Sequence, residues 1–318
     1  MADINKVDKA LKTKSFEWRD WFVFFILFAL IIMFSLLNDK FFQWGNFAAI
    51  GRQTAMTSLI AFGATFVITA GQIDLSVGSV VGLVGVVVAM ALRSGLGVVE
   101  ASLIGLAVGT VVGLVNGVLT AKAKIPAFLV TLGTMMMVRG LALTVTNTKS
   151  VIIVNKAFTK TWGSGLFFGI PSSIMWTALF FLLCIWLYHY TYFGNYVKAV
   201  GGNNIAAKYS GIKVDRTVIL SFIIAGFLAG VAGLLMAARL KSGRPEVGFG
   251  LELDAIAAVI LGGTPIFGGR GRMVNTLVGA LIMGIIINGL IILGVQSNIQ
   301  QIIKGAIIIA AVSLNKKE

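Results

Sequence analysis

The sequence predicts an all-α, polytopic integral membrane protein of about ten transmembrane helices, with both termini cytoplasmic. Of its 318 residues, 58% are hydrophobic and only 12% are charged, whereas soluble domains average about 45–50% apolar and about 25% charged residues. Several uncharged stretches also reach about 20 residues, the length that crosses a hydrocarbon core about 30 Å thick at a rise of 1.5 Å per residue. The clearest are 21–38, 101–121, 217–238 and 273–303.

Each predicted helix follows from an apolar stretch bounded by charges or turn residues. The first, 21–38, follows a segment of mixed charge, and no small-residue cleavage site comes after it, so we expect a retained helix rather than a signal peptide. The other predicted helices are 50–70, 75–93, 98–121, 127–146, 172–192, 217–238, the short 253–263, 274–295 and 299–314. We therefore expect one transmembrane domain over 21–314, flanked by cytoplasmic segments 1–20 and 315–318.

The basic residues predict the orientation. Lys and Arg cluster before the first helix, after the fourth, sixth and eighth predicted spans and at the end of the chain, in these groups: Lys6, Lys9, Lys12, Lys14 and Arg19; Lys122 and Lys124; Lys198, Lys208, Lys213 and Arg216; Arg270 and Arg272; Lys316 and Lys317. The positive-inside rule assigns that side to the cytoplasm. Arg239, Lys241 and Arg244 fall on the other side and disagree. The net charge of +14 is thus explained by basic residues at the ends of membrane spans. We expect membrane lipid as a partner and no nucleic acid.

The residues of catalytic and metal sites are scarce. Cys184 is the only cysteine and His189 the only histidine, so we predict no metal site, no catalytic constellation and no resident cofactor. His189 lies in "WLYHYTYFG" with Trp186, Tyr188, Tyr190 and Tyr192, a composition typical of an interfacial aromatic belt. The chain has no G-x-x-x-x-G-K-[ST] phosphate loop, so any ATP must be bound elsewhere.

Glycine spacing predicts close helix packing. Glycines recur every four residues at 105–117, 78–82 and 226–230, which lines them along one helix face and lets backbones approach. Two weak echoes, "VGLVNGVL" (112–119) with "GIIINGLI" (284–291) and "DLSVGSVVGLVG" (74–85) with "LDAIAAVILGG" (253–263), leave an internal duplication open.

Five polar residues are candidates for a pathway or gate: Asp74, Ser76, Asn116, Asp254 and Asn288. Ionisable groups within membranes face the interior or a cavity. The alternatives are that the two aspartates cap helix N-termini and that the two asparagines bond neighbouring helices. We expect a structural pairing for Arg139, with a partner that the sequence does not name.

The segment "GGNNIAAKYSGIKVD" (201–215) is compact and polar between long uncharged runs. Its "IAAK" favours a helix, and glycines flank it, which predicts a short helix on the cytoplasmic side that could dock in a groove of a partner. A solvated connecting loop is the alternative.

Three stretches together resemble the permease subunits of bacterial sugar ABC importers of the ribose and galactose type. They are the 201–215 segment, "GQIDLSVGS" (71–79) and "ELDAIAAVILGGTPIFGGRGR" (252–272), and the resemblance runs from about residue 40 to the C-terminus. The family often has Glu ahead of the paired alanines in 201–215, whereas Ile205 stands here. With Ile205 in place of Glu, the resemblance supports docking on the ATPase but does not imply a particular salt bridge to it.

The resemblance implies a non-enzymatic subunit that forms the pathway for a monosaccharide in the bacterial plasma (inner) membrane. It implies three partners: a separate ATPase subunit that binds ATP, a substrate-binding protein, and a second permease, expected as a homodimer. The ATPase-coupling residues it implies are Gly201, Gly202, Asn203, Ala206, Ala207, Lys208, Ser210 and Gly211. An ABC permease for another small solute, such as a nucleoside or signalling sugar, and an ion-coupled secondary transporter stay open as alternatives.

Overall fold

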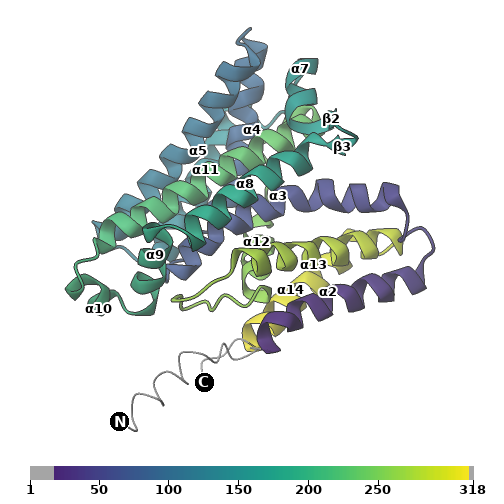
Figure 1. The fold of residues 1–318 in the computed structure, drawn as a ribbon. Helices are drawn as coiled ribbons and strands as arrows, with labels where there is room; N and C mark the ends of the chain where they lie inside the picture. The colour runs from purple at the N-terminus through teal and green to yellow at the C-terminus, as the bar shows by residue number, and fades with distance from the viewer. Residues whose placement is uncertain (1–17, 315–318) are drawn as a thin grey trace.

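The computed structural model describes residues 18–314, and over this range the chain is almost entirely helical (Figure 1). The predicted terminal segments 1–20 and 315–318 lie outside the described residues, apart from 18–20. The helices are α2 (Trp18–Leu37), α3 (Trp44–Thr69), α4 (Val77–Arg93), α5 (Val98–Ala121), α6 (Ala127–Thr146), α7 (Lys156–Thr159), the π-helical turn η1 (Lys160–Ser164), α8 (Ser172–His189), α9 (Tyr192–Gly202), α10 (Asn204–Tyr209), α11 (Val214–Leu240), α12 (Leu251–Leu261), α13 (Met273–Ile292) and α14 (Ser297–Leu314).

Every predicted helix has a counterpart, but several ends differ for local reasons. The helix expected at 75–93 begins only at Val77, because residues 70–76 are largely non-helical. The helix expected at 172–192 ends at His189, where the chain turns into the separate helix α9. Five helices are long and apolar enough to cross a membrane, namely α5, α6, α8, α11 and α13. The count of ten spans and the side of the termini stay predictions.

The purely α-helical description needs one correction. Two short antiparallel ladders occur in the described range: β1 (Val151–Ile152) with β4 (Ser242–Gly243), and β2 (Leu166–Phe167) with β3 (Ile170–Pro171). The first ladder joins the 147–171 connection to the chain that follows α11. The second is a hairpin directly before α8.

Helix α11 is the centre of the bundle. It packs against α3, α4 and α5, and it is far more buried than α5, α6 or α8. Figure 1 shows α3 lying between a group that contains α5, α8 and α11 and a group formed by α2, α12 and α13. The packing is close because the glycine faces of α5 and α11 meet: Gly109 lies against the backbone of Gly226 and Gly230, and Gly113 against the carbonyl of Phe222.

The glycines of α4 have an unexpected neighbour. Gly78 and Gly82 face the non-helical chain between α11 and α12: a Cβ on Gly78 would meet the Glu252 carboxylate and the Gly248 carbonyl, and one on Gly82 would lie 2.7 Å from the Val247 carbonyl. After α11 the chain therefore runs back along α4, and α12 begins beside the first turn of α4. Within a bilayer, non-helical backbone is tolerated where it is buried in protein or lines a water-filled cavity, and the glycine face of α4 buries part of this segment.

The same packing order occurs twice. Helix α3 packs on α12 and α13, α4 packs on α5 and α6, and an extended segment precedes the short helix α4. In the second half, α11 packs on α4 and α5, α12 packs on α13 and α14, and an extended segment precedes the short helix α12. This correspondence supports the duplication that the two sequence echoes suggest, because the echoes fall on α4 with α12 and on α5 with α13.

We predict that Gly113→Leu will prevent stable folding. A side chain at this position would collide with the Phe222 carbonyl and force α5 from α11, and overpacking of this kind typically costs about 1–3 kcal/mol. The measurement is the melting temperature and the size-exclusion profile in detergent. The matched control is Gly133→Leu on α6, since no atom lies within 4 Å of an added Cβ there. Equal melting temperatures for both variants and the parent would contradict the prediction.

Candidate translocation pathway and coupling surface

Three of the five predicted pathway residues lie in one buried hydrogen-bond chain. The backbone N–H and the hydroxyl of Ser76 donate to Oδ1 of Asp74, at 2.8 and 2.6 Å. The amide of Asn116 donates to Ser76 Oγ at 2.8 Å, and the hydroxyl of Thr134 donates to Asn116 Oδ1 at 2.7 Å. All four side chains are buried. The chain of bonds joins the segment before α4 to α5 and α6.

These bonds fix where α4 begins. A buried polar group is costly without a partner, and a network in which every member is bonded avoids that cost and holds one arrangement. Asp74 accepts the N–H of Ser76, and Ser76 is itself the N-cap of α4, so Asp74 does not cap the helix. Asn116 bonds across helices, as the structural alternative for the asparagines expects. Thr134 was not among the predicted residues, because one threonine in an apolar span carries no distinguishing signal.

A second polar junction surrounds the extended segment before α12. Nη1 of Arg139 donates to the carbonyls of Pro245 and Val247, at 2.6 and 2.7 Å. The structural pairing expected for Arg139 is thus confirmed, and its partners are backbone carbonyls. Glu252, also missed by the sequence analysis, is buried; its Oε1 accepts the N–H of Gly250, whereas its Oε2 has no hydrogen-bond partner.

The remaining two pathway candidates do not join the chain around Asp74. Asp254 pairs with Lys304 at 2.9 Å, which links α12 to α14. Asn288 lies on the buried face of α13, and its Oδ1 has no hydrogen-bond partner. Asp74, Ser76 and Asn116 therefore belong to one bonded network, whereas Asp254 forms an ion pair and Asn288 has an unpaired buried oxygen.

Segment 201–215 contains the predicted short helix. Helix α9 ends at Gly202, and Asn203 then caps α10 by accepting the N–H groups of Ile205 and Ala206, at 3.1 and 3.0 Å. Asparagine is a preferred N-cap because its side chain satisfies these free donors. Gly211 adopts a φ of +82° just beyond the end of α10, a left-handed conformation that favours glycine.

The two faces of α10 differ. Ala207 is buried in a cluster with Val67, Val200 and Val218, so it fastens the helix to the bundle. Ile205 and Tyr209, one turn apart, are 65% and 89% exposed. Ile205, at the position where the family often has Glu, is thus an exposed apolar side chain on the free face of α10.

The first residue of segment 201–215, called the coupling segment below, has no space for a side chain. Gly201 lies directly against the carbonyl of Thr69 and the N–H of Gly269, and that N–H donates to the Thr69 carbonyl at 2.9 Å. The end of α3, the start of the coupling segment and the loop before α13 therefore meet at one point. At Gly202 the nearest atom to an added Cβ is 3.9 Å away.

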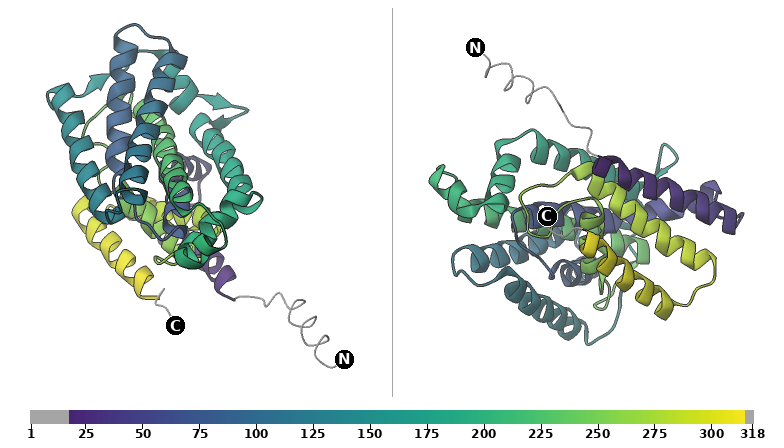
Figure 2. Two further views of the ribbon diagram at one scale, coloured as in Figure 1. Left: turned by 90° about the vertical axis from the view of Figure 1, so that its left-hand side faces the viewer. Right: turned by 90° about the horizontal axis from the view of Figure 1, so that it is seen from below.

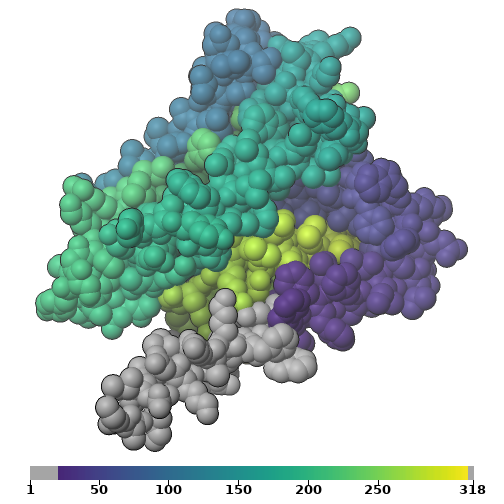
Figure 3. All heavy atoms as spheres, in the orientation of Figure 1, coloured from purple at the N-terminus to yellow at the C-terminus, as the bar shows by residue number. Residues whose placement is uncertain are grey.

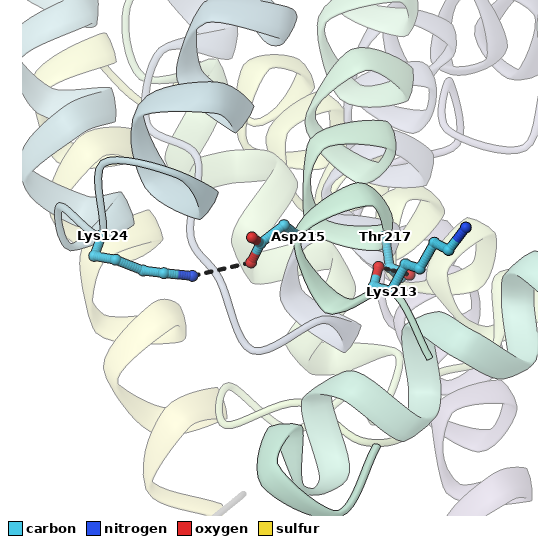
Figure 4. Close-up of polar contacts among 4 residues, drawn as sticks. All are labelled: Lys124, Lys213, Asp215 and Thr217. Atoms are coloured by element: carbon cyan, nitrogen blue, oxygen red, sulfur yellow. Dashed lines mark hydrogen bonds and ion pairs between the residues drawn. The ribbon is translucent and has the colours of Figure 1, made fainter. Parts of the chain in front are cut away.

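An ion pair lies beside this region. Figure 4 shows Lys124, in the loop between α5 and α6, pointing to Asp215 at the start of α11, with 2.9 Å between Nζ and Oδ1. The hydroxyl of Thr217 donates to the Lys213 carbonyl at 3.2 Å in the same turn. Both members of the ion pair are largely exposed, so the pair contributes little stability.

The aromatic-belt interpretation is wrong for Tyr188. Its ring is fully buried, its hydroxyl lies 3.0 Å from Oγ1 of Thr69, and Lys198 Nζ lies 4.8 Å from the ring centroid. His189 Nε2 accepts the N–H of Met273 at 3.4 Å, at the start of α13. The other three aromatic residues assigned to the belt, Trp186, Tyr190 and Tyr192, are exposed. Within residues 18–314, no three His, Cys, Asp or Glu side chains cluster as metal ligands would.

Comparison with known proteins identifies the family. The model of the family described as "Branched-chain amino acid transport system / permease component" matches residues 46–312. The ribose import permease protein RbsC of Bacillus subtilis (strain 168) is 46% identical over 294 residues, which cover 92% of this chain and 91% of that protein. RbsC of Escherichia coli (strain K12) is 40% identical, over 92% of each chain.

A third relative carries a different sugar name. The D-allose transport system permease protein AlsC of Escherichia coli (strain K12) is 37% identical, over 94% of this chain and 91% of that protein. No solved structure matches the chain significantly. The resemblance drawn from the three sequence stretches is thus confirmed, as is the expectation of a transport subunit, not an enzyme, in the bacterial plasma membrane. The chain belongs to the family of transport-system permease components.

Proposed function

We propose that the chain is the transmembrane subunit of an ATP-driven ABC importer and forms the pathway for a monosaccharide such as ribose. The observation that carries this proposal is the sequence similarity to permeases named for ribose import and allose transport, which extends over more than 90% of each chain. A binding protein delivers the sugar, a separate ATPase subunit supplies the energy, and a second copy of the permease completes the pore. ATP is bound by the ATPase partner, in keeping with the lack of a phosphate loop here.

The coupling role of α10 is supported by its construction. The helix is capped by Asn203, held from below by Ala207 and free on the face that carries Ile205 and Tyr209. Helices that dock in a partner groove use apolar anchors spaced by three or four residues. We assign the docking surface to this face, with Gly201, Gly202, Asn203, Ala206, Ala207, Lys208, Ser210 and Gly211 forming its frame.

Few residues separate α10 from the buried hydrogen-bond chain that includes Asp74 and Ser76, called the polar chain below. Gly201 contacts the backbone of Thr69 at the end of α3, and only residues 70–73 separate Thr69 from Asp74. A rigid-body shift at the docking surface therefore displaces the segment that holds Asp74 and Ser76. Because packed interfaces switch between discrete arrangements, we assign Asp74, Ser76, Asn116 and Thr134 to a gate rather than to direct sugar recognition.

Purification and reconstitution test the function as a whole. We expect the chain to retain an ATPase subunit when isolated from its native membrane, and we expect uptake of radiolabelled ribose into proteoliposomes to require ATP and the binding protein. Uptake driven by a proton or sodium gradient without any ATPase would overturn the importer proposal. ATP-driven uptake of a nucleoside and not of ribose would contradict the proposed substrate but not the importer mechanism.

We predict that Ile205→Arg will abolish ATPase retention and lower uptake at least tenfold without loss of folded protein. The residue is 65% exposed on α10, so a charge there disturbs a docking partner but no internal packing. The control is Val154→Arg, which is 83% exposed in the connection between α6 and α8 and should leave ATPase retention unchanged. Wild-type retention by Ile205→Arg would show that α10 is a solvated connection.

We predict that Asn116→Leu will slow uptake at least tenfold and destabilise the protein by about 1–3 kcal/mol, because buried partners lose their hydrogen bonds. The change removes the bonds to both Ser76 and Thr134. Thr110→Val on the same helix is the control, since the Thr110 hydroxyl bonds only the Leu106 carbonyl of its own helix. Uptake and melting temperature are compared for both variants. Unchanged uptake in Asn116→Leu would remove the polar chain from the gate.

A further inference from the structure

The β2–β3 hairpin has an unusual residue at its tip. Phe167 pairs with Ile170, so only Phe168 and Gly169 form the turn, and both have positive φ, +51° and +80°. A two-residue turn of this kind strongly prefers Asn-Gly, because the left-handed conformation disfavours a bulky side chain. An aromatic residue in a position that disfavours it suggests a function for the side chain.

The tip exposes a continuous apolar surface. Phe168 is 99% exposed and Leu166 is 63% exposed, and Phe167 and Ile170 also count among the exposed large hydrophobic residues. No Asp, Glu, Lys or Arg occurs between 161 and 197, a range that includes the hairpin, the whole of α8 and the start of α9. The hairpin therefore continues the uncharged surface of a membrane-spanning helix.

The length of α8 places the hairpin at the bilayer boundary. Helix α8 is a candidate span of 18 residues, which at 1.5 Å per residue is about 27 Å, slightly less than a hydrocarbon core of about 30 Å. Its first residue, Ser172, directly follows Pro171 of the hairpin. The hairpin thus begins where the hydrocarbon meets the headgroups.

The base of the hairpin is rigid and aromatic. The rings of Trp162 and Trp176 stack with 4.5 Å between centroids, and their N–H groups donate to Ser102 Oγ and the Thr161 carbonyl, both at 3.0 Å. The N–H of Ser172 donates to the Gly165 carbonyl at 2.8 Å, which closes the loop. Tryptophan is enriched at membrane interfaces, and a fixed base presents the tip without an ordering cost.

The hairpin projects away from the bundle. Figure 1 and the left view of Figure 2 both show it standing out from the helices beside the start of α8. Figure 3 shows that α8 lies on the outer face of the molecule on this side, and Leu179, Leu182 and Leu183 of α8 are exposed there. The surface next to the hairpin is thus the apolar surface that lipid covers.

We propose that the β2–β3 hairpin is a membrane anchor that inserts the Phe168 ring into the leaflet at the N-terminal end of α8, at the junction of headgroups and acyl chains. The occupant of this surface is lipid. A soluble protein partner is disfavoured because protein interfaces combine an apolar centre with a polar rim and direct hydrogen bonds. Residues 161–197 carry no charged side chain, and the charge next to the hairpin is that of Lys160 at its base. The anchor is independent of the transported solute.

The chain allows a direct depth measurement. Cys184 is the only cysteine and is buried, so the parent protein, labelled in parallel, reports any background. Phe168→Cys is spin-labelled in the full chain in lipid nanodiscs, and collision rates with oxygen, which enters lipid, and with a water-soluble nickel complex are compared. Leu182→Cys on α8 is the lipid reference, and Tyr209→Cys on α10, 89% exposed, is the water reference.

We expect the label at Phe168→Cys to resemble Leu182→Cys, with oxygen collisions exceeding nickel collisions severalfold. We also expect that Phe168→Asn, which suits the turn but removes the apolar tip, will increase nickel access to a label at Leu166→Cys, and this second measurement stands if Phe168→Cys folds poorly.

Three outcomes would overturn the proposal. Nickel access at Phe168→Cys equal to that at Tyr209→Cys would place the tip in water. Protection that arises only after the substrate-binding protein is added would make the hairpin a protein-docking surface. Spin–spin broadening between labels would make it a contact between two copies of the chain.

Discussion

The structure depends on the requirement that every backbone polar group inside a bilayer be satisfied within the protein. Two extended segments, 70–76 before α4 and 241–250 before α12, break the helical bonding that normally meets this requirement. The glycine face of α4 lets the second segment approach, and Arg139 donates to two of its carbonyls. Glycine and arginine in these spans thus have complementary roles: one makes room for irregular backbone, and the other bonds it.

Much of the fold could be predicted from the sequence, since uncharged length is a direct requirement for crossing a membrane. All ten expected helices exist, and the meeting of the glycine faces of α5 and α11 follows from four-residue spacing. The break after His189 was not predicted, because the aromatic residues that follow it suit a helix equally well. Residues 71–74 and 239–252 lie between predicted helices, but the course of the second segment along α4 depends on tertiary contacts that the sequence does not show. Tyr188 illustrates the limit, since it sits in an aromatic run but packs inward on Thr69.

The site was predictable in its individual residues and not in its connections. Asp74, Ser76 and Asn116 are conspicuous as polar residues in apolar surroundings, whereas the bonds that unite them with Thr134 depend on how α5 and α6 cross. Asp254 has the same sequence context as Asp74, yet it pairs with Lys304 on α14. Equal sequence signals in the two halves therefore lead to different chemistry, because the residue that meets each aspartate comes from a distant helix.

The two halves share a backbone plan but place different polar groups at corresponding positions. In the first half, Asp74, Ser76, Asn116 and Thr134 bond one another, although the hydroxyls of Thr54 and Thr120 are buried without a partner. In the second, Glu252 Oε2 and Asn288 Oδ1 are buried without one, a condition that costs about 1–3 kcal/mol per group, and more for a charged group. A rearrangement that brings a donor to these oxygens lowers the free energy, whereas one that opens the network around Asp74 raises it. The bonded network is therefore the energetic barrier that movement of the proposed gate must overcome, and the unpaired oxygens of the second half are groups that a second state can satisfy.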